Sequence, residues 1–127
     1  MIRIGRNPQP VIYRDDYSFE IGKALTLREG KDVTVIATGR MVYLALLAAK
    51  KLEDEEIDTR VINIHTIKPL DRETIIQAAQ ESREIVTVEE HNILGGLGEA
   101  VAGCLAEDNP LLSLSFHLLR FPVFPSL

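Results

Sequence analysis

The chain has 127 residues, of which 46% are apolar and 26% charged, and its net charge is −5. This length and apolar content fit one packed domain, and the acidic balance disfavours a nucleic-acid partner, because phosphate binding needs a basic face. No apolar run is long enough to span a membrane, and the first residues lack the apolar core of a signal peptide. With Cys104 as the single cysteine, we expect a cytoplasmic protein in which this thiol is a small buried hydrophobe rather than a nucleophile.

The first part of the chain reads as a connector followed by an edge strand. Ile2–Ile4 alternates like a strand, and Pro8 and Pro10 then favour an extended segment. Ile2–Ile4 therefore resembles a strand that belongs to something upstream. Residues 11–19 are mixed and predicted as loop, and Ala24–Arg28 alternates apolar and polar residues as a half-exposed strand does.

Two buried strands and a helix follow. Val33–Ala37 is almost continuously apolar, which is typical of a strand covered on both faces. Met41–Glu56 repeats apolar residues with the period of an amphipathic helix, and its acidic end should be solvated. Val61–Ile64 is the second buried strand, which ends at His65.

The second half continues the alternation. Asp71 is a suitable N-cap for a helix from Arg72 to Ser82 that should bury Ile75, Ile76 and Ala79. A strand over Ile85–Val88, a helix over Leu97–Ala106 and a last strand over Leu112–Leu118 complete the pattern. Strands that alternate with helices predict parallel pairs with right-handed crossovers, and so a three-layer α/β/α sandwich.

The stretch Arg83–Glu99 carries the candidate site. After the strand it turns polar at Glu89, Glu90 and His91, and glycines follow at 95, 96 and 98 before a helix begins. A strand, a polar tip, a glycine turn and a helix are the layout of a site at the carboxyl edge of an α/β sheet. Glu89 and Glu90 should point to opposite faces if the strand continues through them.

The glycine turn, Gly95, Gly96 and Gly98, allows two interpretations. Glycines let backbone amides approach an anion or the backbone of a partner. The dinucleotide-binding pattern is broken, because Val101 stands where its last glycine should be, and no Gly-Lys-Ser/Thr follows as in a Walker loop. Close packing of this loop against another domain or subunit is therefore favoured over nucleotide binding.

Two histidines extend the candidate site. His65 and His91 both follow parallel strands, so we expect them at the same edge together with Glu90. Histidine there can bind a phosphate or transfer a proton, although a surface histidine bound to its own loop is the commoner situation. No His/Cys spacing supports a metal site. Arg6, between a glycine and a proline-rich turn, offers a guanidinium suited to phosphate but reads on its own as a solvated charge.

Three motifs together carry a resemblance to a known family. The chain resembles the C-terminal domain of transketolases, which also occurs in 1-deoxyxylulose-5-phosphate synthases and in the beta subunits of 2-oxo acid dehydrogenases; its best match is the C-terminal section of a split transketolase. The resemblance covers residues 2–106, and the motifs are Asp32–Gly39, Asn63–Asp71 and Val86–His91 followed by Gly95–Gly98.

The resemblance implies a non-catalytic role. In such enzymes thiamine diphosphate and Mg²⁺ bind between two other domains at the interface of a homodimer, and the reaction transfers a two-carbon ketol unit between sugar phosphates. The C-terminal domain is implied to have a five-stranded mixed sheet with one antiparallel edge strand, to hold no cofactor ligands and to serve assembly. Residues 1–16 would end the preceding pyrimidine-binding domain and its linker, and residues 17–127 would form the C-terminal-like domain. Arg6 matches the arginine that contacts the substrate phosphate.

The chain departs from this family in two places, and other functions stay open. Deoxyxylulose synthases carry an arginine at the position of His65, which disfavours that branch, and Leu111–Leu127 differs from the usual family ending. From the residues alone, a standalone phosphate- or nucleotide-binding module and a pure dimerisation module are the alternatives.

Overall fold

Strands and helices alternate along the chain, as the hydrophobic patterns predict. The computed structural model describes residues 8–13, 16–90, 92, 94–108 and 117–118. The strands are β1 (Leu25–Arg28), β2 (Val33–Ala37), β3 (Thr59–Asn63), β4 (Glu84–Val88) and β5 (His117–Leu118). The helices are α1 (Met41–Glu53), α2 (Arg72–Glu81) and α3 (Leu97–Asp108).

The strands form one mixed sheet in the order β1-β3-β2-β4-β5. β1 runs antiparallel to β3, and the other neighbours are parallel. In the centre of the sheet Val35 lies opposite Val61 on one side and Val86 on the other. The mixed sheet with a single antiparallel pair is thus confirmed. Of the predicted last strand, only residues 117–118 lie within the described part of the chain.

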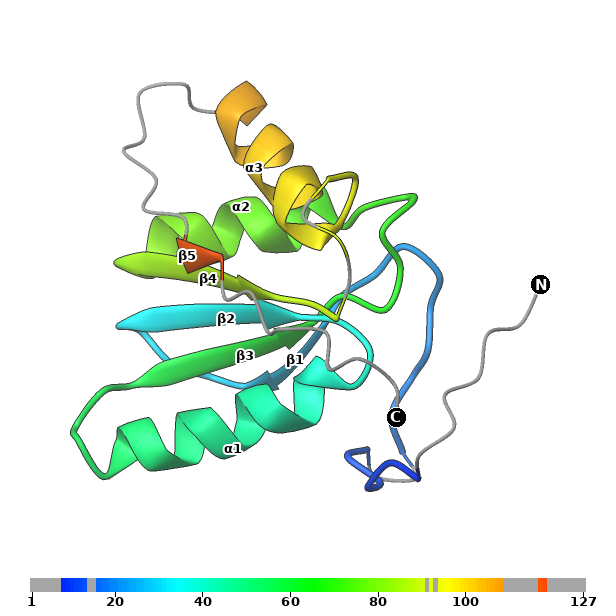
Figure 1. Cartoon of the computed structure of the whole chain (residues 1–127). Coiled ribbons are helices and arrows are strands. Elements are labelled where there is room, and N and C mark those ends of the chain that lie inside the picture. The colour runs from blue at the N-terminus through cyan, green and yellow to red at the C-terminus, as the bar shows by residue number, and fades with distance from the viewer. Residues whose placement is uncertain (1–7, 14–15, 91, 93, 109–116, 119–127) are drawn as a thin grey trace.

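Helices cover both faces of this sheet. Figure 1 shows α1 alone on one face and α2 with α3 on the other. Each face has its own core: Val35, Ala37 and Val61 pack under α1, whereas Ile36, Ile62 and Ile85 pack under α2 and α3. The side chains alternate between the two faces because successive residues of a strand point in opposite directions. The predicted three layers are therefore present.

Several boundaries differ from the predictions for local reasons. α1 ends at Glu53 instead of Glu56, and Glu56 has a φ of 61°. Consecutive acidic residues are unfavourable at a helix C-terminus, where the helix dipole is negative. In α2 the fully buried residues are Ile75 and Ala78, whereas Ile76 and Ala79 are only partly buried.

One glycine is required by the fold itself. A Cβ at Gly30, in the turn between β1 and β2, would lie 2.9 Å from the Cα of Thr59 and closer still to the following peptide group. Such a distance is far below normal contact, so a side chain would push this turn away from β3.

Among the described residues, no helix combines the length and apolar character that crossing a membrane requires.

Candidate functional site

The parallel strands β2, β3 and β4 end at a common edge of the sheet, where the sequence predicted the site. His65 and Glu90 lie at this edge, whereas His91 and Arg6 lie outside the described residues. Because β2 lies between β3 and β4, the ends of the strands that carry His65 and Glu90 are about 10 Å apart. Among the described residues no hydrogen bond joins the two side chains: Glu90 contacts Arg40, and His65 contacts Thr66.

Glu90 contacts the start of α1. Its Oε1 lies 3.3 Å from Nη1 of Arg40, and both side chains are about half exposed, at 58% and 44%. An exposed ion pair of this kind contributes little to stability. It does connect the loop after β4 with the turn after β2 at the carboxyl edge.

Glu89 points the opposite way and is buried, with 9% of its surface exposed. Its Oε2 accepts a hydrogen bond of 2.7 Å from the backbone N–H of Leu97, and its Oε1 accepts one of 3.0 Å from that of Gly98. These amides begin α3 and have no partner within the helix. Glu89 is therefore the N-terminal cap of α3, a role that its position in the sequence did not indicate.

The glycine turn makes this cap possible. A Cβ at Gly96 would lie 2.5 Å from Oε1 of Glu89 and 2.7 Å from its carboxyl carbon. Gly95 has a φ of 74°, and its N–H donates to the Glu99 carboxylate. The close approach predicted for the turn is thus real, but its neighbour is a carboxylate of the same chain. Packing of Gly95, Gly96 and Gly98 against a partner stays a prediction.

The cap also bears on the phosphate-binding interpretation. A helix N-terminus binds an anion through its free amides and its dipole. At α3 the amides of Leu97 and Gly98 already bind the Glu89 carboxylate. A phosphate at this place would have to displace a buried carboxylate or be repelled by it, and this disfavours a nucleotide site at the glycine turn.

The segment before β1 covers the end of β3. The Asn63 amide, in a side chain with only 4% exposure, donates to the Tyr13 hydroxyl, and the rings of Tyr13 and Tyr17 stack with centroids 4.2 Å apart. The Phe19 ring lies 4.4 Å from the His65 ring, whose Nδ1 is 2.8 Å from the Thr66 hydroxyl. The buried Nε2 of His65 has no hydrogen-bond partner among the described residues. His65 thus bonds to its own loop, as the simpler interpretation expects, but it is half-buried beside Phe19 and not a surface residue.

Asp71 caps α2, as predicted. Its carboxylate accepts hydrogen bonds from the Thr74 N–H at 3.2 Å, the Thr74 hydroxyl at 2.9 Å and the Ala24 N–H at 2.8 Å. Burial alone would raise the pKa of Asp71, but these hydrogen bonds and the nearby charge of Lys23 hold its pKa below the ordinary value. The same residue thus fixes the start of α2 and the start of β1.

The single cysteine lies in the core of the domain. Cys104 is 2% exposed, and burial raises the pKa of its thiol, so it packs as the small hydrophobe that the sequence predicted. Among residues 8–13, 16–90, 92, 94–108 and 117–118, no three His, Cys, Asp or Glu side chains are placed to hold a metal ion.

Comparison with known proteins places the chain in a family. The family model described as "Transketolase, C-terminal domain" matches residues 22–125. The chain belongs to this family. The matched range includes all three motifs, and the resemblance drawn from them is confirmed.

Several relatives are subunits of divided enzymes. The chain is 46% identical over 110 residues to a 6-deoxy-6-sulfo-D-fructose transketolase subunit of Clostridium sp. (strain MSTE9), covering 87% of this chain and 34% of the relative. It is 46% identical over 111 residues to an apulose-4-phosphate transketolase subunit of Phocaeicola vulgatus, covering 87% and 35%. Human transketolase is 41% identical over 124 residues, covering 95% and 20%. The chain thus spans about a third of the length of the two bacterial subunits.

Solved structures agree with the fold. A structure described as "Split gene transketolase, inactive beta4 tetramer" matches with a TM-score of 0.79 and 46% identity, over 83% of this chain and 35% of that one. A 2-oxoglutarate:ferredoxin oxidoreductase from Magnetococcus marinus matches with a TM-score of 0.55 and 10% identity, over 80% of this chain and 17% of that one. The second likeness extends to the fold alone.

Proposed function

We propose that this chain is the non-catalytic C-terminal section of a thiamine-diphosphate-dependent transketolase, which transfers a two-carbon ketol unit between sugar phosphates. The observation that carries the proposal is the match over 87% of the chain to subunits of divided transketolases. A section that covers a third of such relatives leaves room in them for the domains that bind the cofactor.

The carboxyl edge supports a role in assembly more than in catalysis. Two buried carboxylates are used within the chain: Glu89 binds the N-terminus of α3, and Asp71 binds that of α2. Thiamine diphosphate needs a divalent cation and donors for its diphosphate, whereas the described residues hold no cluster of metal ligands and the Leu97 and Gly98 amides of α3 already bind Glu89. We therefore assign the cofactor and Mg²⁺ to a partner polypeptide or domain, with which this chain would form a homodimeric enzyme or a larger assembly.

Arg6 is the one residue that we assign to the substrate. The assignment follows from the family resemblance, because residues 1–7 lie outside the described part of the chain. In the assembled enzyme, Arg6→Ala should raise the KM for phosphorylated substrates about ten- to hundredfold, since a charged hydrogen bond contributes about 1.5–3 kcal/mol. KM values for unphosphorylated analogues should change little. Equal changes for both substrate types would contradict the assignment.

The second candidate, a standalone nucleotide- or phosphate-binding module, is weakened by the Glu89 cap. Calorimetric titration of the full chain with nucleotides and inorganic phosphate separates the two functions. We expect no saturable binding in the absence of the thiamine-binding partner. Micromolar binding that Glu89→Ala changes would favour the module instead.

A further inference from the structure

The outer face of α1 is apolar although it is turned away from the sheet. Tyr43, Leu44 and Leu47 are 37%, 44% and 42% exposed. No charged residue occurs between Met41 and Ala49. A helix that is apolar on both sides is normally buried on both sides, and α2, in contrast, exposes charged and amide side chains along its length.

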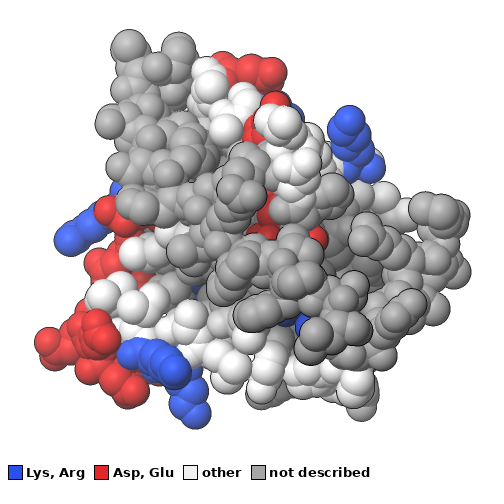
Figure 2. Space-filling model, in the orientation of Figure 1, with Lys and Arg blue, Asp and Glu red and all other residues white. Residues whose placement is uncertain are grey.

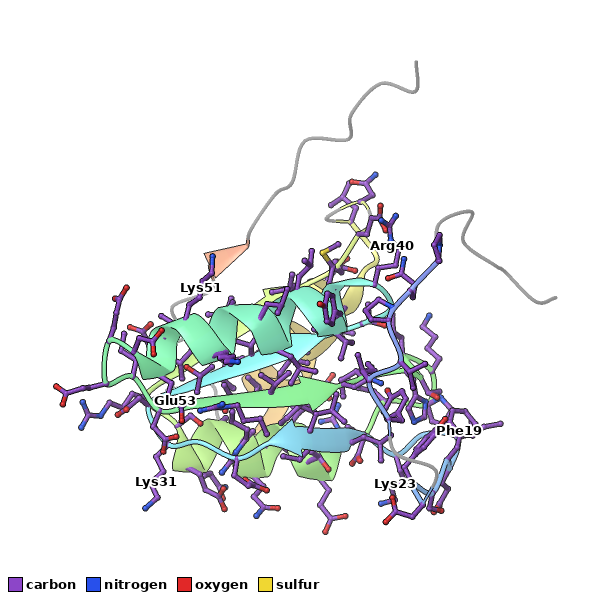
Figure 3. The ribbon with its side chains drawn as sticks, turned by 90° about the horizontal axis from the view of Figure 1, so that it is seen from below. Phe19, Lys23, Lys31, Arg40, Lys51 and Glu53 are labelled. Carbon is purple, nitrogen blue, oxygen red and sulfur yellow. The ribbon has the colours of Figure 1, made fainter. Side chains whose placement is uncertain are left out.

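This apolar stripe is bounded by opposite charges. Arg40 precedes α1 and Asp54 follows it, and both keep helical backbone angles, with φ and ψ of −63° and −25° for Arg40 and −65° and −21° for Asp54. Each lies seven residues from Leu47, so all three fall on nearly the same line of the helix surface. Figure 3, which views the molecule from the α1 side, shows Arg40 at one end of the helix and Lys51 near the other.

We propose that α1 binds α1 of a second copy of this chain, antiparallel, about a two-fold axis at Leu47. In this arrangement Leu47 meets Leu47 of the second copy, and Tyr43 lies opposite Lys51, where an ammonium group can rest on an aromatic ring. Leu44 lies opposite the aliphatic part of Lys50. Arg40 lies opposite Asp54 at both ends of the contact, about 10 Å from the axis.

The charges favour this orientation and this occupant. A parallel pairing would set Arg40 against Arg40 and Lys51 against Lys51, whereas the antiparallel pairing matches opposite charges twice. Arg40 uses Nη1 for Glu90, and Nη2 can bind a second carboxylate. Within the described residues the Asp54 carboxylate makes no ion pair, while its neighbour Glu53 is bound to Arg28 at 3.3 Å. Figure 2 shows acidic side chains gathered at the end of α1, next to basic side chains, with uncharged surface further along.

The contact deepens the assembly role proposed above and rests on it for its biological use. A cysteine at the two-fold axis tests it directly. In the full chain, Leu47→Cys should form a disulfide-linked dimer under mild oxidation, because the two thiols face each other across the axis. Gln80→Cys, on exposed α2, is the matched control and should stay monomeric on a non-reducing gel, and the native Cys104 is buried. No crosslink at position 47 above the Gln80→Cys level would overturn the proposal.

A charge exchange tests the orientation. In a Glu90→Gln background, which removes the present partner of Arg40, Asp54→Arg should weaken self-association about tenfold, measured by analytical ultracentrifugation. Adding Arg40→Asp to Asp54→Arg should restore it, because both end pairs then regain opposite charges. Weakening without rescue, in variants with native circular dichroism, would overturn the antiparallel pairing.

The failure of this contact can be told apart from the failure of the proposed function. Ketol transfer with the thiamine-binding partner is measured on the same Leu47→Cys protein under reducing conditions. Ketol transfer without a crosslink would refute the α1 contact and leave the proposed function intact. A crosslink without ketol transfer for any partner would refute the proposed function and leave the α1 contact intact. If the thiol introduced by Leu47→Cys is protected from a thiol reagent only after the partner is added, the face belongs to that partner and the self-contact is overturned.

Discussion

The two helical layers of this domain differ in how much of their surface is satisfied within the chain. On one face of the sheet, α2 and α3 each receive a buried carboxylate at the N-terminus, from Asp71 and Glu89. On the other face, α1 has no side-chain hydrogen bond at its N-cap and exposes Tyr43, Leu44 and Leu47. In the first layer the helix N-termini are capped by side chains of the same chain. The second layer has the exposed apolar surface that is typical of a helix covered in an assembly.

The layer of α2 and α3 also carries an ion pair between its helices. Arg72 of α2 lies 2.9 Å from a Glu107 carboxylate oxygen of α3. Substitutions that disrupt the caps of this layer should therefore reduce the stability of the domain, and substitutions on α1 should change association instead.

Glu89→Ala should cause the largest loss. It leaves the amides of Leu97 and Gly98 without their acceptor in a largely buried place, and the free energy of unfolding in urea should fall by about 3 kcal/mol. Glu90→Ala is the matched control one residue away, because its ion pair with Arg40 is exposed and should contribute less than about 0.5 kcal/mol. Similar losses for the two variants would mean that the α3 cap does not stabilise this layer.

Gly96→Ala should cost about 2 kcal/mol, because its Cβ overlaps the Glu89 carboxylate. The overlap disappears when Glu89 is already alanine. A double-mutant cycle should therefore give a coupling of more than about 1 kcal/mol between the two sites. Additive losses would show that Gly96 is needed for some other reason, such as packing against a partner.

Asp71→Ala should lower the free energy of unfolding by about 1.5 kcal/mol at neutral pH. The pKa of Asp71 is lowered in the folded state. Its contribution to the free energy of unfolding is therefore present above the ordinary carboxyl pKa of about 4 and is lost as the pH falls through the folded-state pKa. In urea titrations of both proteins, the difference between them should shrink as the pH is lowered from 7 to 3. A difference that grows towards low pH would contradict this assignment.

Leu47→Glu should change the free energy of unfolding least, within about 0.5 kcal/mol, because the side chain is 42% exposed on the isolated domain. Its effect should fall on association, since two carboxylates would face each other at the proposed axis. Sedimentation should show monomers with native circular dichroism. A large loss of stability would place Leu47 in the core of the domain and remove the contrast between the layers.

The contrast between the two caps also explains what the sequence could predict. Asp71 was predicted because it acts on Thr74, three residues away in the same turn. Glu89 reaches Leu97 and Gly98 across the glycine turn, a geometry that depends on how β4 and α3 pack. The available signal was an acidic residue at the end of β4, followed by a glycine turn that opens a helix.

The hydrophobic periodicity predicted which segments form strands and which form helices, whereas it did not predict the contacts between distant segments. β3 begins at Thr59, which is polar yet fully buried, and so the apolar pattern predicted its start two residues late. Tyr13 and Asn63 are joined by a hydrogen bond across 50 residues of chain, and nothing in the loop pattern of residues 11–19 pointed to it. For the candidate site, the edge and its glycine turn were predictable from strand order, but the inward direction of Glu89 was not.

The central claim is that this chain contributes to ketol transfer without holding the cofactor. The most direct measurement is ketol transfer from a sugar phosphate by the purified chain, with thiamine diphosphate and Mg²⁺, before and after adding the polypeptide that carries the thiamine-binding domains. We expect background activity for the chain alone and activity that appears and saturates with the partner. Activity of the chain alone, or full activity of the partner without it, would contradict this role.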